Sequence, residues 1–130
     1  QRHCANGMAV AKFLELTRKW LCQLLRPRVQ PYHALAEKYL QRQLRRRLLR
    51  PGRRPRSRQH LYEGAELAAI ETHVADARTC CLNPASSTHR QMNDEQLAAA
   101  GVPAELVRMS CGLESSEDLI ADIAQALDQI

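Results

Sequence analysis

Apolar side chains recur every three or four positions near both ends of the chain, which predicts a helix at each end. The first helix is expected over residues 5–16. The last is expected to begin at Ser115 or Ser116, either of which can cap it, with Glu117 and Asp118 in a first turn where the helix dipole favours negative charge. Its apolar stripe comprises Leu119, Ile120, Ile123, Leu127 and Ile130.

Strand-like segments lie before the last helix. Residues 77–82 are a short apolar run typical of a buried strand, and residues 106–113 alternate between two faces. The polar loop 83–89 and a short helix, capped by Asn93 or Asp94 and ending at Gly101, connect them. The pattern predicts a small α+β unit of short antiparallel strands packed with helices.

The first half of the chain gives a weaker signal. Pro31 can begin a short helix over residues 31–40, whereas residues 16–30 are irregular. Residues 41–65 hold nine arginines and have no apolar face wide enough to bury. We therefore divide the chain into residues 1–65 and residues 66–130.

The net charge of +5 hides an asymmetry between these halves. Residues 1–64 hold 16 Lys and Arg against three acidic residues, which gives +13, whereas residues 65–130 hold three Arg against eleven acidic residues, which gives −8. A basic segment such as 41–58 can bind nucleic acid by neutralising phosphates. No aromatic residue interleaves with its arginines before Tyr62, so a base-stacking platform is not expected.

Other classes of protein are excluded by composition. No apolar run approaches the length of a membrane span, and the first residues lack the pattern of a secretory signal peptide. Five cysteines, an odd number without a C-x-x-C pair, fit reduced thiols and no metal site. We therefore expect a cytoplasmic protein.

From Thr72 onward the chain carries four motifs in a fixed order: DART, PASSTH, LVRMSCGLE and DLIAD. This segment resembles the C-terminal end of the pyridoxal-phosphate-dependent enzymes of cysteine and methionine metabolism, and most of all their O-acetylhomoserine sulfhydrylase branch. Residues 2–15 and 31–40 resemble earlier parts of the same region. The resemblance implies the C-terminal small domain of a fold type I enzyme, present as a fragment.

An intact enzyme of this kind would convert O-acetylhomoserine and sulfide, or a thiol, into homocysteine or methionine, with pyridoxal 5′-phosphate as cofactor. The resemblance also admits the sister activities of methionine γ-lyase, cystathionine γ-synthase and cystathionine lyase. It implies an amino-acid substrate, a homotetrameric parent enzyme and no membrane or nucleic-acid partner. Because the cofactor lysine of the family belongs to its N-terminal part, this chain alone is expected to hold no catalytic residue and to be inactive.

The same resemblance assigns candidate site residues. Arg108, in the Leu-Val-Arg-x-Ser strand, corresponds to the arginine that binds the substrate α-carboxylate, and a planar guanidinium suits that task because it offers two parallel donors. His73 is a weaker candidate beside the same carboxylate, or a solvent-facing histidine. A third group of residues, which either support the strand of Arg108 or satisfy their own loop, comprises Ser86, Thr88 and His89. Asn83 departs from the family, which usually has His before Pro-Ala-Ser.

Between the family-like islands the similarity disappears, although the gaps keep the expected length. Permitted codons for residues 44–56, read one base later, encode a segment resembling the glycine-rich strand and turn that the family has there. The same shift converts residues 22–30 and 61–65, and residues 16–20 convert when they are read two bases later. We therefore hypothesise that residues 16–30 and 41–65 are translated out of frame.

Overall fold

The computed structural model describes residues 1–17, 20–21, 38–39, 47–51, 61, 63–73 and 76–129. Their helices and strands follow in this order along the chain: α1 (Arg2–Leu16), β1 (Trp20–Leu21), β2 (Arg47–Pro51), β3 (Ala69–Ile70), β4 (Cys80–Leu82), α4 (Asp94–Ala99), β5 (Val107–Ser110) and α5 (Ser116–Asp128).

The strands form one sheet in the order β1-β2-β5-β4-β3. Three of the four neighbouring pairs are antiparallel, and only the pair of β3 and β4 is parallel. The predicted α+β class with short antiparallel strands is confirmed, with this one parallel edge. β5 lies at the centre of the sheet, so its side chains are flanked on both sides.

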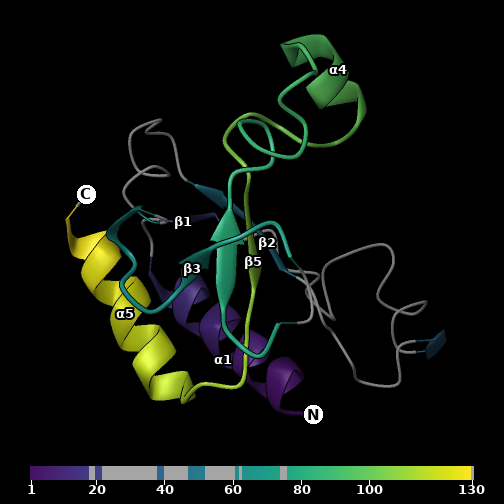
Figure 1. Cartoon of the computed structure of the whole chain (residues 1–130). Helices are drawn as coiled ribbons and strands as arrows, with labels where there is room; N and C mark the ends of the chain where they lie inside the picture. Colours follow the sequence, from purple (N-terminus) through teal and green to yellow (C-terminus); the bar gives the residue numbers. More distant parts are fainter. Residues whose placement is uncertain are drawn as a thin grey trace.

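Helices α1 and α5 lie side by side and pack through one apolar core with the sheet (Figure 1). The core takes Val10 and Leu14 from α1 and Leu119 and Ile123 from α5, and its sheet members are Cys81, Val107 and Met109. Since neighbouring residues in a strand point to opposite faces, Arg108 and Ser110 point away from the two helices.

The connection between β4 and β5 forms an arm that extends from the sheet and carries α4 at its far end (Figure 1). Asn93 caps α4 through a hydrogen bond from Gln96 N–H, and the Gln96 side chain accepts from Asn93 N–H in return. Gly101 follows the helix with φ of 71°, a conformation that glycine adopts without strain. The capping residue and the stop were both predicted from the sequence.

The terminal helices and the two strands of the second half are also confirmed, although both strands are shorter than predicted. In α5, Leu119, Ile123 and Leu127 are buried as expected. Ile120 is only partly buried, and Asp122, which is not part of the predicted stripe, is buried. Ile130 and most of the predicted helix 31–40 lie outside the described residues.

Strands β1 and β2 lie in segments for which the pattern predicts no strand, so that interpretation was wrong at these positions. The physical reason is that a ladder joins backbone groups and needs no apolar face: β2 pairs with the central strand β5 through residues 47–49. A strand at this place does agree with the resemblance to the glycine-rich strand of the family. The remainder of the Arg-rich segment 41–58 lies outside the described residues.

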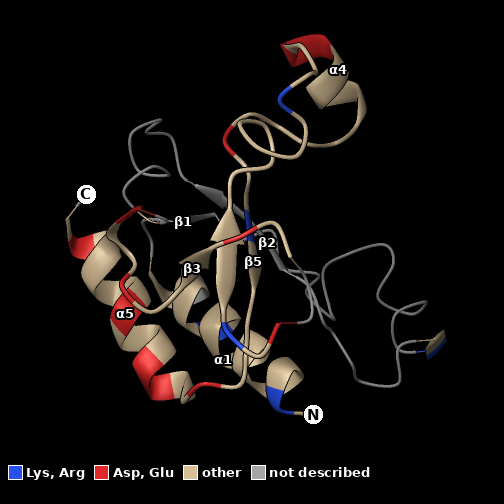
Figure 2. Ribbon diagram, in the orientation of Figure 1, with Lys and Arg blue, Asp and Glu red and all other residues tan. Residues whose placement is uncertain are grey.

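Acidic residues recur along α5, where the ribbon is coloured red (Figure 2). In the part of the chain that the structure describes, no helix is long and apolar enough to cross a membrane. The same residues contain no group of three or more His, Cys, Asp or Glu able to hold a metal ion.

Candidate functional site

Arg108 lies in the centre of the sheet, on the face opposite α1 and α5. Its backbone is flanked by Leu48 of β2 on one side and by Leu82 of β4 on the other. The side chain is partly buried. A charge in such a position needs polar partners, because leaving water costs free energy that only hydrogen bonds or an opposite charge can offset.

Among the described residues, Arg108 has a backbone carbonyl as its hydrogen-bond partner. After β3 the chain crosses β4 and β5 (Figure 1), and Nη2 of Arg108 donates a hydrogen bond of 2.6 Å to the carbonyl oxygen of Thr72. No carboxylate among the described residues forms an ion pair with Arg108. Because a guanidinium has five N–H donors, the contact orients the group and still permits it to bind an anion.

His73 follows Thr72 directly, so the backbone contact brings the two family-derived candidates into the same part of the molecule. The side chain of His73 is exposed to solvent. Its assignment to the carboxylate stays a prediction, as does that of Arg108.

In the loop after β4, the side chains of Ser86, Thr88 and His89 bond to other residues of the loop. Ser86 binds Asn83 twice, through its backbone N–H at 2.9 Å and its hydroxyl at 3.3 Å, and the hydroxyl of Thr88 lies 2.9 Å from Nδ1 of His89. Within the described residues, none of these three side chains hydrogen-bonds to Arg108. Their supporting role therefore stays a prediction.

The residue that links this loop to β5 is Asn83, which the sequence marks only as a departure from the family. Its side-chain amide donates to the carbonyl oxygens of Ala104 at 2.9 Å and Leu106 at 2.8 Å. The Asn-Pro pair signals only a local turn, in which the Asn83 side chain accepts from the backbone N–H of Ser86, and does not indicate the partners 21 and 23 residues away. The contact of Thr72 left no such signal, because any residue could supply its carbonyl.

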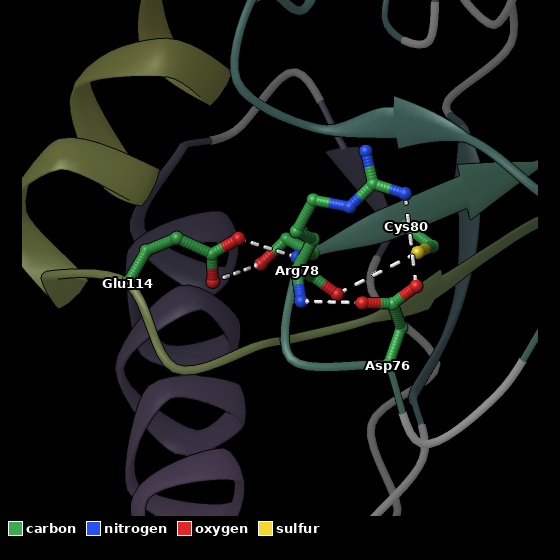
Figure 3. Close-up of polar contacts among 5 residues, drawn as sticks. Asp76, Arg78, Cys80 and Glu114 are labelled. Atoms are coloured by element: carbon green, nitrogen blue, oxygen red, sulfur yellow. Dashed lines mark hydrogen bonds and ion pairs between the residues drawn. The ribbon is translucent and has the colours of Figure 1, made fainter.

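The turn before β4 shows why Arg78 is a poorer anion site than Arg108 (Figure 3). Asp76 accepts a hydrogen bond of 2.9 Å from the backbone N–H of Arg78, and its other oxygen lies 3.7 Å from the guanidinium. The Arg78 N–H, assisted by the Arg78 charge, holds the pKa of Asp76 below its usual 3.8. Arg78 is thus exposed and already paired with a carboxylate, whereas Arg108 is neither.

Glu114 fastens the other end of this turn to the strand. It accepts hydrogen bonds from both the backbone N–H and the hydroxyl of Thr79, which is fully buried (Figure 3). The Thr79 hydroxyl in turn accepts from Gly112 N–H at 2.9 Å. These bonds join the start of β4 to the end of β5, and so fix the two strands beside Arg108 against each other.

Among the residues that the structure describes, no lysine is placed to hold pyridoxal phosphate. The cofactor needs a lysine for its aldehyde, an acid for its pyridinium nitrogen and donors around its phosphate. Lys12 is exposed on α1, Lys38 lies over the ring of Tyr39 at 5.2 Å, and Lys19 is outside the described residues. What the described surroundings of Arg108 offer is a guanidinium that keeps donors able to bind an anion.

Comparison with known proteins gives a consistent picture. The family model described as Cys/Met metabolism PLP-dependent enzyme matches residues 1–128. Homocysteine synthase of Schizosaccharomyces pombe is 36% identical over 134 residues, which cover 98% of this chain and 30% of the relative. L-methionine gamma-lyase of Treponema denticola is 33% identical over 132 residues, covering 100% of this chain and 33% of the relative.

Solved structures share the fold. A crystal structure from Campylobacter jejuni, described as a putative O-acetylhomoserine (thiol)-lyase, superimposes with a TM-score of 0.89 at 28% identity. The match covers 98% of this chain and 31% of that protein, which itself contains a pyridoxyl-lysine. The chain therefore spans about a third of the length of the relatives that it matches.

Proposed function

Because this chain belongs to the family of Cys/Met metabolism PLP-dependent enzymes, we propose that it is the C-terminal part of an O-acetylhomoserine sulfhydrylase. In the reaction, the γ-carbon of O-acetylhomoserine loses its acetoxy group as acetate and forms a bond to the sulfur of sulfide. The product is homocysteine, or methionine when the sulfur comes from methanethiol. Pyridoxal phosphate stabilises the carbanions that such a replacement requires.

The contribution of this chain is to bind the substrate. Arg108 holds the α-carboxylate by two parallel N–H donors, and a carboxylate fixed in this way sets the orientation of the remaining amino acid. The observation that carries the proposal is a partly buried guanidinium, oriented by the Thr72 carbonyl and unpaired with any described carboxylate. His73, next to Thr72, is a second ligand in this proposal.

The cofactor lysine and the phosphate cradle belong, in this proposal, to parts of the enzyme outside this chain of 130 residues. The chain by itself is then inactive. The parent enzyme would be a homotetramer, which the molar mass of the full-length protein in solution would test.

The experiment is to assay the full-length, cofactor-loaded enzyme for acetate release from O-acetylhomoserine with sulfide. Arg108→Ala is expected to raise KM for O-acetylhomoserine about 100-fold, because one bidentate charge-assisted contact is lost. Arg108→Lys keeps the charge but loses the two-donor geometry, so it should recover only part of the loss. Arg78→Ala, at an exposed and already paired arginine, is the matched control and should leave KM unchanged.

A sister activity is the second candidate, favoured by the identity of 33% to a methionine γ-lyase across the whole chain. The same full-length enzyme should be offered methionine, and separately cystathionine. Release of methanethiol from methionine without turnover of O-acetylhomoserine would show that the enzyme is a methionine γ-lyase and not a sulfhydrylase. An unchanged KM in Arg108→Ala would instead refute the carboxylate site in this protein, whichever of these activities it has.

A further inference from the structure

We infer that Asn83 is a positioning residue for the carboxylate site, because its side-chain amide fixes the start of the strand that carries Arg108. The inference rests on the proposed function of Arg108. It concerns a residue that does not touch the substrate itself and acts through the backbone of β5.

The position of Asn83 is the first observation. It directly follows Leu82, the β4 residue that pairs with Arg108 across the ladder. The residue is 7% exposed, so its amide has little access to water and depends on protein partners. Asn83 thus stands at the base of the arm, next to the central pair of the sheet.

The hydrogen bonds of the Asn83 side chain join the two chain segments at the base of the arm, one leaving β4 and one entering β5. Nδ2 donates to the carbonyl oxygens of Ala104 and Leu106, the latter only two residues before Arg108. On the other side of the amide, Oδ1 accepts from the backbone N–H of Ser86 at 2.9 Å. The side chain therefore clamps the segment entering β5 to the segment leaving β4.

Only an amide meets this arrangement. A single NH₂ group supplies two protons to two carbonyl oxygens while the oxygen of the same group accepts a third bond. An aspartate has the same shape but no proton to donate when ionised, so both carbonyls would face a negative oxygen. A histidine offers at most one ring N–H toward them in its neutral form.

Without the clamp, the arm would be free to turn about its base, and the first residues of β5 would lose a fixed position. Displacement of the Arg108 backbone moves a guanidinium that must meet a carboxylate with two aligned donors. The expected consequence is weaker substrate binding with nearly normal turnover of the bound substrate.

A double-mutant cycle on the full-length, cofactor-loaded enzyme tests this role. Asn83→Asp should raise KM for O-acetylhomoserine about tenfold and change kcat by no more than about twofold. In an Arg108→Ala background the same substitution should have almost no further effect on KM, because the group that it positions is gone. Ser87→Ala is the control: its hydroxyl bonds the Asn83 backbone carbonyl at 2.5 Å, but its loss leaves the amide clamp intact.

The outcomes distinguish the positioning role of Asn83 from the carboxylate site at Arg108. Equal effects of Asn83→Asp with and without Arg108 would overturn the positioning role and leave the carboxylate site standing. An unchanged KM in Arg108→Ala alone would refute the proposed function, and the inference would fall with it. If the Asn83→Asp enzyme is insoluble or fails to bind cofactor, the cycle is run with Asn83→His, which keeps one donor. This variant should raise KM about threefold when Arg108 is present and should have no effect on KM in the Arg108→Ala background.

Discussion

Two adjacent thiols in β4 are withdrawn from water on opposite faces of the sheet. Cys80 is 2% exposed and Cys81 is 1% exposed. Burial raises the pKa of both thiols, and that of Cys81 to about 12. A thiol in this state reacts slowly because the thiolate is the nucleophile, so both residues serve as small apolar side chains.

The burial of Cys81 predicts a loss of stability in alkaline solution. An unfolded Cys81 releases its proton near its ordinary pKa of 9.0, whereas the folded residue holds it until about pH 12. The stabilisation is complete below pH 9, and the free energy of unfolding should fall as pH rises from 9 toward 12, where the unfolded state binds fewer protons.

Urea denaturation of the chain at several pH values measures this decline. Cys81→Ala should be less stable at neutral pH because it leaves a small cavity, but its stability should fall less steeply with pH. A decline as steep as that of the unsubstituted chain would contradict the assignment to Cys81.

At this scale, residues in local motifs could be predicted and residues with distant partners could not. The capping side chains of Asn93 and Ser115 bind within their own helix ends, so the sequence around them was sufficient. Asp122 is not part of the predicted apolar stripe of α5, yet it is buried, and its carboxylate accepts three backbone N–H bonds, at 2.7 to 3.2 Å, from residues 66–68. No pattern within α5 could indicate partners 54 to 56 residues away.

Among the elements, α1 depends on the segment between β5 and α5. The amide of Asn6 donates to the carbonyl oxygens of Gly112 at 2.9 Å and Glu114 at 2.8 Å, and Nδ1 of His3 lies 2.8 Å from the carbonyl oxygen of Cys111. Gly112 is at the centre of these contacts. A β-carbon there would overlap the backbone of Ala77 and Arg78, so the close approach of residues 77–78 to residue 112 requires glycine.

Gly112→Ala should therefore reduce the free energy of unfolding by about 1–3 kcal/mol, the usual cost of forcing extra volume into a packed site. Gly64→Ala is a matched control, because its β-carbon would meet its nearest neighbours at 3.5 Å, an ordinary contact distance. Thermal or urea unfolding of both variants measures the difference. Equal free energies of unfolding for Gly112→Ala and Gly64→Ala would show that residue 112 and residues 77–78 can move apart without loss of stability.

Prediction at the scale of elements succeeded where the signal is local. Periodicity and caps indicated α1, α4 and α5, and alternation indicated β5. Strands β2 and β3 were not predicted because their pairing with β5 and β4 depends on backbone groups that every sequence offers. The central position of Arg108 between β2 and β4 was accordingly beyond prediction, although the resemblance identified the residue itself.

For the whole molecule, the division between a basic and an acidic half depends on the reading frame in which the gene is translated. Thirteen of the 16 Lys and Arg in residues 1–64 lie in the segments 16–30 and 41–65, which we hypothesise to be out of frame. The remaining Arg2, Lys12 and Lys38 nearly balance Glu15 and Glu37. The basic half would then be no adaptation to an anionic partner.

Resequencing the gene tests this hypothesis directly. We expect insertions or deletions of bases at the borders of the two segments and between residues 20 and 22, where the shift changes, with family-like residues in the corrected frames. An uninterrupted frame encoding the nine arginines would contradict it. In that case salt-dependent retention of the chain on nucleic acid becomes the next measurement, since phosphate contacts weaken steeply with salt.

The bonds between α1 and residues 111–114 also set the order of events during synthesis. They join positions 106 to 112 residues apart in sequence. A ribosome releases α1 long before its partners exist, and at common rates of elongation the helix waits for about 5–20 s with its apolar face uncovered. This region can therefore complete its folding only after residues 111–114 have been synthesised, and nascent chains stalled before residue 111 leave α1 without these partners.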